Sequence, residues 1–123
     1  MSLKSSPTPL RYVVLRHDGV PDPHFDMMFE TAPGSDLATW RSPVWPLTAA
    51  TPLTQLRDHR RAYLDYEGLV SGDRGSVYRI AEGTCLVVRH NDGSWMITLL
   101  DQPNRPTLML SFIEPASWVG TLS

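Results

Sequence analysis

Short apolar runs, each rich in β-branched and aromatic residues, recur along the chain and are separated by turn-forming residues. Such runs predict β-strands, because Val, Ile, Tyr, Phe and Trp fit a pleated, half-buried surface. The predicted strands cover residues 11–16, 24–30, 37–41, 76–80, 84–89, 95–100 and 107–113. Their regular spacing is typical of an antiparallel sandwich or barrel. The pattern therefore predicts a mainly β fold.

Three segments between these runs have different interpretations. Residues 48–58 are predicted to form a loop with a short helical turn. Glu82-Gly83 is interpreted as a hairpin turn between the strands on either side of it. Residues 1–10 are predicted to be a disordered leader, since they lack the apolar stretch of a signal peptide. The folded domain is therefore expected to span residues 11–123.

Composition narrows the class of protein further. The chain has 123 residues, which suits one domain, and its 11 prolines and 8 glycines exclude a long-helix bundle. A single cysteine excludes an internal disulfide and a Cys-rich zinc module. A net charge of −2 gives no general attraction to nucleic acid, so phosphate binding would need a local basic patch or a metal. No apolar run approaches the ~18 residues of a membrane span, and we expect a cytoplasmic protein that does not enter a membrane.

The candidate metal ligands lie near the N-terminal end of the predicted domain. His24 and Asp26 are two residues apart on one predicted strand, so their side chains point to the same face. His17 supplies a third ligand if the first two strands pair as a hairpin. Two imidazoles and a carboxylate suit Mn²⁺, Zn²⁺ or Fe²⁺ and leave coordination positions for water and substrate. The alternative interpretation is that these histidines are ordinary surface or loop residues.

A second polar cluster contains the densest basic patch of the chain, formed by Arg57, Arg60 and Arg61. In an extended segment His59, Arg61 and Tyr63 would share one face. His59 suits acid–base catalysis, and Arg61 suits bidentate binding of phosphate. The alternative is a solvated charged loop that neighbouring carboxylates neutralise. The remaining candidates are weaker: Cys85 is interpreted as a small core residue, His90 as a turn residue, and residues 72–75 as a turn rather than a phosphate-binding loop.

Four short motifs together indicate a family. Tyr12-Val-Val-Leu-Arg-His-Asp18 precedes His24-Phe-Asp-Met-Met-Phe-Glu30; Trp40 then precedes Pro43, and Asp58-His59 precedes Tyr63 and Tyr66-Glu67-Gly68. In order and spacing, over about residues 11–80, they resemble the 3′-phosphoesterase domain of bacterial DNA ligase D. That family carries aromatic-Val-x-x-Lys-His-Asp, His-Tyr-Asp-Phe-Arg-Leu-Glu, Ser-Trp-Ala-Val-Pro-Lys and Asp-His-Pro-Leu-Asp-Tyr-x-x-Phe-Glu-Gly.

The resemblance implies a compact antiparallel β-barrel with a divalent metal in a groove. Mn²⁺ is the expected metal and Zn²⁺ the alternative. His17, His24 and Asp26 would be the metal ligands. His59 and Tyr63 would contact the scissile phosphate, with His59 as the transition-state or leaving-group partner. Members of the family remove 3′-phosphates and 3′-terminal ribonucleosides from DNA ends during repair. This chain would be a divergent, stand-alone member that works in trans with DNA ligase or polymerase partners on DNA 3′ ends or on a smaller phosphoester.

The chain departs from the family at positions that would bind phosphate. Met28 replaces the family's Arg, Val44 its Lys, and Leu15 a common Gln. Removing such donors usually costs orders of magnitude in rate. The substitute phosphate-binding candidates are Arg16 and Arg61, with Arg41 and Arg60 as further possibilities.

These departures keep rival functions open. The first rival is a catalytically degenerate module that binds a metal or a nucleic-acid end without hydrolysis. The second is a small β-barrel that uses the same pocket for an unrelated metabolite.

Overall fold

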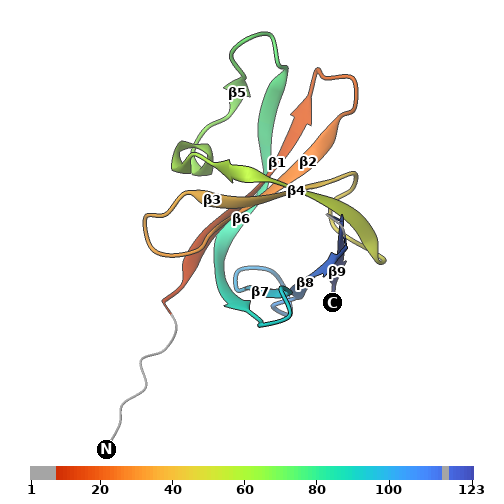
Figure 1. Cartoon of the computed structure of the whole chain (residues 1–123). Coiled ribbons are helices and arrows are strands. Elements are labelled where there is room, and N and C mark those ends of the chain that lie inside the picture. Colours follow the sequence, from red (N-terminus) through yellow and green to blue (C-terminus); the bar gives the residue numbers. More distant parts are fainter. Residues whose placement is uncertain (1–7, 115–116) are drawn as a thin grey trace, which may run out of the picture.

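The computed structural model describes residues 8–114 and 117–123 and shows a single, mainly β domain (Figure 1). The predicted leader lies outside the described residues up to position 7, and the first strand begins at Leu10, one residue earlier than expected. The elements are β1 (Leu10–Asp18), β2 (His24–Glu30), β3 (Leu37–Ser42), β4 (Thr51–His59), the 3₁₀ turn η1 (Arg61–Leu64), β5 (Gly68–Leu69), β6 (Ser76–Arg89), β7 (Trp95–Leu99), β8 (Thr107–Ile113) and β9 (Ser117–Leu122).

Eight of these strands close into an antiparallel barrel. The order is β1-β2-β3-β4-β9-β8-β7-β6, and β6 pairs back onto β1, while the short β5 adds to the other edge of β6. This closure confirms the predicted small antiparallel β-barrel. Figure 1 shows β5 at the end of the barrel where β1 and β2 are joined, with η1 between the end of β4 and β5.

The barrel interior is filled by aromatic and aliphatic side chains from every strand of the ring. Trp40 is fully buried at its centre, with its ring 5.0 Å from that of Trp95 and 5.4 Å from that of Trp118. Cys85 lies in the same core, as predicted, and burial raises the pKa of its thiol to about 12. A thiol with that pKa is protonated at neutral pH and is not a nucleophile.

A second, smaller apolar cluster covers the outer face of β1 and β2. It contains Val13, Leu15, Met28, Leu37, Leu64 and Val77. Strands that are buried on both faces are apolar almost without alternation, which explains the weak period-two pattern of residues 24–30. The outer cluster is closed by Leu64 of η1, so this turn packs directly on the sheet.

The sequence did not predict β5 or β9 as strands, and two of its interpretations of single segments are wrong. Residues 51–59 form β4 rather than a loop, because pairing with β3 holds a strand whose side chains are mostly exposed and show no apolar period. β6 runs without interruption through Glu82-Gly83, which pair with Val13 and Tyr12 of β1. Gly83 is needed there for close approach, since a Cβ would collide with the Asp101 carboxylate.

No helix among residues 8–114 and 117–123 is long and apolar enough to cross a membrane.

Candidate metal centre

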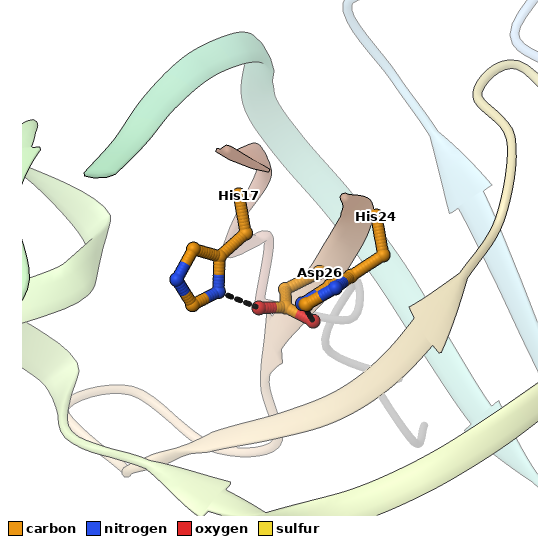
Figure 2. A group of neighbouring side chains, drawn as sticks. All are labelled: His17, His24 and Asp26. Carbon is orange, nitrogen blue, oxygen red and sulfur yellow. Dashed lines mark ion pairs between the residues drawn. The ribbon is translucent and has the colours of Figure 1, made fainter. Parts of the chain in front are cut away.

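The register of the β1–β2 hairpin brings the three predicted metal ligands together. His17 lies directly opposite His24, and Asp26 lies two residues further along β2 on the same face. His17 Nδ1 is 3.9 Å from Asp26 Oδ2, and His24 Nε2 is 3.5 Å from Asp26 Oδ1. One ligand atom from each residue lies within 4.8 Å of the other two (Figure 2). The hairpin predicted from the sequence therefore forms, and it groups these side chains.

Hydrogen bonds to backbone carbonyls orient both imidazole rings. His17 Nε2 lies 2.6 Å from the Arg74 carbonyl oxygen, and His24 Nδ1 lies 2.7 Å from that of Asp22. A carbonyl only accepts, so in each ring the proton sits on the nitrogen that faces the carbonyl. The other ring nitrogens, His17 Nδ1 and His24 Nε2, face the Asp26 carboxylate and are the atoms that would carry the lone pairs in neutral rings. A metal-ligating histidine usually donates its other ring N–H to a carbonyl or a carboxylate, and both histidines have a carbonyl in that position.

The residues present fit a divalent metal ion. His24 and Asp26 are 7% and 3% exposed, and neither His24 Nε2 nor Asp26 Oδ1 has a hydrogen-bond partner among the described residues. When both rings are neutral, a cation between the two nitrogens and the carboxylate offsets their mutual repulsion. A buried set of two imidazoles and one carboxylate suits Mn²⁺, Zn²⁺ or Fe²⁺, so the ligand set alone leaves the identity of the metal undetermined.

A glycine allows the loop before β6 to reach His17. Gly75 has a φ of +77°, and a Cβ there would collide with the carbonyl oxygen of Asp18. Val70 N also donates to Gly75 O at 2.8 Å and closes the loop. Glycine at this position lets the loop pack against the end of β1, which places the Arg74 carbonyl beside His17.

Beside the ligands lies a cleft of about 220 Å³. His17 and Asp26 line it together with His59 and Tyr63, the two residues predicted to contact a phosphate. His59 Nδ1 lies 3.0 Å from the Arg57 carbonyl oxygen, and the His59 and Tyr63 rings are 5.6 Å apart. The structure therefore brings both predicted catalytic residues and two of the three predicted ligands, His17 and Asp26, to one cleft, and His24 lies next to Asp26 outside its lining.

Two ion pairs and one buried leucine fix η1, which carries Tyr63. Arg61 of η1 pairs with the Glu30 carboxylate at the end of β2, and Asp65 pairs with Arg11 of β1 at 2.9 Å. Burial by itself raises the pKa of the Glu30 carboxyl, but hydrogen bonds from Arg61 and from two backbone N–H groups outweigh burial and lower that pKa. Leu64, the last residue of η1, is buried against the sheet, so η1 is held over the outer face of the sheet.

The two predicted phosphate-binding arginines, Arg16 and Arg61, are not among the residues that line the cleft. Arg16 belongs to the opposite face of β1, where it pairs with Asp18 and stacks over Phe25. Arg61 shares no extended segment with His59, because η1 intervenes, and its guanidinium pairs with Glu30.

Other arginines line the cleft instead. Arg41 of β3 lies beside the ligand carboxylate, with its Nε 3.8 Å from Asp26 Oδ1, and Arg74 lines the same cleft. Arg57 and Arg60 line an adjoining hollow together with Arg74, so that four arginines surround His59 and Tyr63. The sequence had suggested Arg41 only as a further candidate and had treated Arg74 as part of a turn. The only sequence feature that could have indicated a role for Arg74 in the cleft was its basic side chain within the Gly-rich turn.

The residues that depart from the ligase D pattern fall in three environments. Met28 is 1% exposed in the outer cluster and lines the cleft. Leu15 is fully buried in that cluster, whereas Val44 is 43% exposed in the segment after β3. Met28 therefore supplies apolar wall where the family would place a cation.

No known family's sequence profile matches the chain, and no curated protein matches it. Membership of the ligase D phosphoesterase family stays a prediction that rests on the motifs and on the geometry of the cleft.

Proposed function

We propose that the protein is a metal-dependent phosphoesterase that acts on a phosphate at a DNA 3′ end, on a 3′-terminal ribonucleotide or on a smaller phosphoester. The observation that carries this proposal is the group of His17, His24 and Asp26, whose possible ligand atoms lie within 4.8 Å of one another and include two buried atoms, His24 Nε2 and Asp26 Oδ1, without a hydrogen-bond partner among the described residues. The same cleft contains a histidine, a tyrosine and two arginines, which are the side chains that bind phosphate and transfer protons.

The role of each residue follows from its position. His17, His24 and Asp26 would hold the metal ion, and the chemistry that such an ion supplies is polarisation of a phosphate oxygen and activation of water. Arg41 and Arg74 offer fixed positive charge to the phosphate oxygens in place of the missing family arginine. His59, whose Nδ1 proton is bound to Arg57 O, donates from Nε2 to a leaving oxygen when its ring is protonated. The Tyr63 hydroxyl would donate a hydrogen bond to a phosphate oxygen.

A second candidate function is metal-dependent binding of a nucleic-acid end without hydrolysis. Met28 favours it, because a buried thioether in the cleft wall cannot neutralise charge that develops on phosphate in a transition state. Arg41 and Arg74 favour hydrolysis, since they bring cations to that cleft from other strands and loops.

The test uses the purified protein, Mn²⁺ and a primer-template whose primer ends in a 3′-phosphate. We expect inorganic phosphate and a primer with a 3′-hydroxyl end, and no product without the metal. His24→Ala should reduce the rate to that of the metal-free protein, and His59→Ala should lower it about 100-fold or more. His90→Ala, which changes an exposed histidine next to a turn, is the matched control and should leave the rate unchanged.

The second readout is the thermal midpoint with and without Mn²⁺, because a ligand that binds only the folded state raises it. If Mn²⁺ stabilises the wild type but not His24→Ala, and no phosphate is released, the binding module is the correct function. If Mn²⁺ stabilises neither protein, the metal centre itself is wrong.

A further inference from the structure

A second hollow adjoins the metal cleft on the side of η1 and β5. Its volume is about 200 Å³, and Tyr63 and Val70 belong to the walls of both spaces. Beyond these shared walls it is formed mainly by Arg60, Tyr66 and Leu69. A group covalently attached to a phosphate in the metal cleft would therefore lie next to this second hollow.

The walls of the second hollow present exposed apolar surface in a fixed geometry. Leu69 is 77% exposed and Tyr66 is 41% exposed. The Tyr66 hydroxyl donates to the carbonyl oxygen of Leu69, and its oxygen would lie 3.6 Å from a Cβ at Gly68. β5 is in turn paired with β6 through Gly68 and Leu69. The Tyr66 ring is thus attached to the sheet and is exposed without being free to rotate.

The composition of the hollow indicates a flat, uncharged group that carries a phosphate. The Tyr63 and Tyr66 rings are 6.1 Å apart and perpendicular, and Tyr63 contacts His59 in the metal cleft, so aromatic rings connect the two spaces. Arg60 adds a positive charge, and among the described residues that line the hollow there is no carboxylate. Aromatic faces with a neighbouring cation are how proteins bind nucleobases of single strands.

We propose that this hollow binds the unpaired base of the nucleotide whose phosphate occupies the metal cleft, with Tyr66 and Leu69 as the specificity-determining residues. The inference rests on the proposed function, because the phosphate must lie in the metal cleft. A base inside a duplex is stacked and paired and does not reach a side pocket unless it is extruded. The preferred substrate is therefore a single-stranded or frayed 3′ end, and not a paired end or a small phosphoester.

The experiment measures binding without turnover. The probe is a short fluorescent oligothymidylate that ends in a 3′-methylenephosphonate, whose carbon–phosphorus bond is not hydrolysed, and binding to the Mn²⁺-loaded protein is followed by fluorescence anisotropy. The same probe is also tested after annealing to a complementary strand, and with its terminal base removed. We expect the single-stranded end to bind about ten-fold more tightly than either comparison probe.

The variants test the two specificity-determining residues. Tyr66→Ala should abolish the preference for the single-stranded end, and Leu69→Ser should reduce it; Leu69 is so exposed that the Ser variant keeps the fold. Tyr78→Ala removes a tyrosine of similar exposure, 49%, from β6 and is the matched control that should retain the preference.

The outcomes separate this inference from the proposed function. Equal affinity for all three probes, or a preference that survives both Tyr66→Ala and Leu69→Ser, overturns the base-binding hollow and leaves the phosphoesterase intact. Failure of every probe to bind in the presence of Mn²⁺ overturns both. A preference for the single-stranded end in a protein that releases no phosphate supports the hollow within a binding module.

Discussion

At the scale of single residues, the Asp26 carboxylate faces both the other two proposed metal ligands and a cation of the protein. The Arg41 Nε lies 3.8 Å from Asp26 Oδ1, and the Arg41 side chain is 45% exposed. A metal ion bound to Asp26 would share this carboxylate with the guanidinium, and the two positive charges repel each other. Arg41 therefore has opposite effects on the two ligands that the cleft is proposed to take.

The variant Arg41→Gln is expected to tighten Mn²⁺ binding and to weaken phosphoester binding. Because the guanidinium is partly solvated, its removal should lower the Kd for Mn²⁺ only about two- to five-fold. The KM for a phosphoester should rise, since one of the cations of the cleft is lost. Isothermal titration calorimetry measures the first effect and steady-state hydrolysis the second.

The control for Arg41→Gln is Arg89→Gln, because Arg89 lies over the Trp95 ring rather than in the cleft. It should change neither quantity. Weaker Mn²⁺ binding by Arg41→Gln would show that Arg41 orients Asp26 rather than competing with the metal.

At the scale of elements, the position of His17 depends on the contact between the loop before β6 and the end of β1. Gly75 makes that contact possible, and the Arg74 carbonyl beside it accepts the hydrogen bond from His17. A ligand on β1 is thus oriented by a backbone group that is 57 residues away in sequence. The loop is therefore part of the proposed metal centre although none of its side chains is a proposed ligand.

Gly75→Ala is expected to lower both stability and metal affinity. The left-handed φ costs about 1–2 kcal/mol for any residue with a Cβ, and the collision with Asp18 O adds displacement of the loop. Losing the carbonyl behind a metal-ligating histidine typically weakens metal binding about 10- to 100-fold. Urea unfolding and calorimetric titration with Mn²⁺ measure the two effects.

Gly34→Ala is the matched control for Gly75→Ala. Gly34 has a similar φ of +81°, but a Cβ there meets no atom within 4 Å. Gly34→Ala should therefore lose about 1–2 kcal/mol of stability, as the φ of Gly75→Ala also does, and should keep the metal affinity of the wild type. Equal metal affinity in both variants would mean that the loop does not orient His17.

At the scale of the whole molecule, Glu30 joins segments that are distant in sequence. Its carboxylate is 4% exposed and accepts hydrogen bonds from Arg11 N at 2.6 Å, from Gly34 N at 3.2 Å and from the Arg61 guanidinium. One buried charge thus connects β1, the turn after β2 and η1. These bonds lower the pKa of Glu30 despite its burial, so the folded state binds this proton less readily than the unfolded chain does.

Stability should consequently fall with pH in the acid range. The unfolded chain takes up the Glu30 proton at a higher pH than the folded protein, so the free energy of unfolding decreases as the pH drops below about 4.5. Glu30→Gln should lose about 1–3 kcal/mol at pH 7 and show a shallower acid decline, because no carboxylate remains to be protonated. Thermal unfolding from pH 7 to pH 3 measures both changes.

Glu114→Gln, at an exposed position after β8, is the control and should follow the wild-type curve. If the stability of Glu30→Gln and that of the wild type fall in parallel between pH 7 and pH 3, Glu30 contributes nothing to the loss of stability in acid.

The strand pattern and the grouping of the metal ligands could be predicted from local sequence. Alternation along a strand places His24 and Asp26 on one face, and a short connection between two strands predicts the hairpin that adds His17. The runs that formed β2, β7 and β8 were apolar enough to be recognised one at a time. The order of the motifs similarly placed His59 and Tyr63 with the ligands.

What only the tertiary structure decided depends on pairing between distant segments. β4 exists because β3 supplies hydrogen-bond partners, and Glu82-Gly83 continue a strand because β1 lies beside them. Arg61 pairs with Glu30, which is 31 residues away in sequence. Arg74 lies at the cleft because its carbonyl accepts a hydrogen bond from His17, which is 57 residues away. Local sequence thus determined most of the strands and which side chains share a face, since both follow from residue preferences and backbone geometry. Only closure of the barrel decided which arginines meet the metal ligands, because that depends on which strands become neighbours.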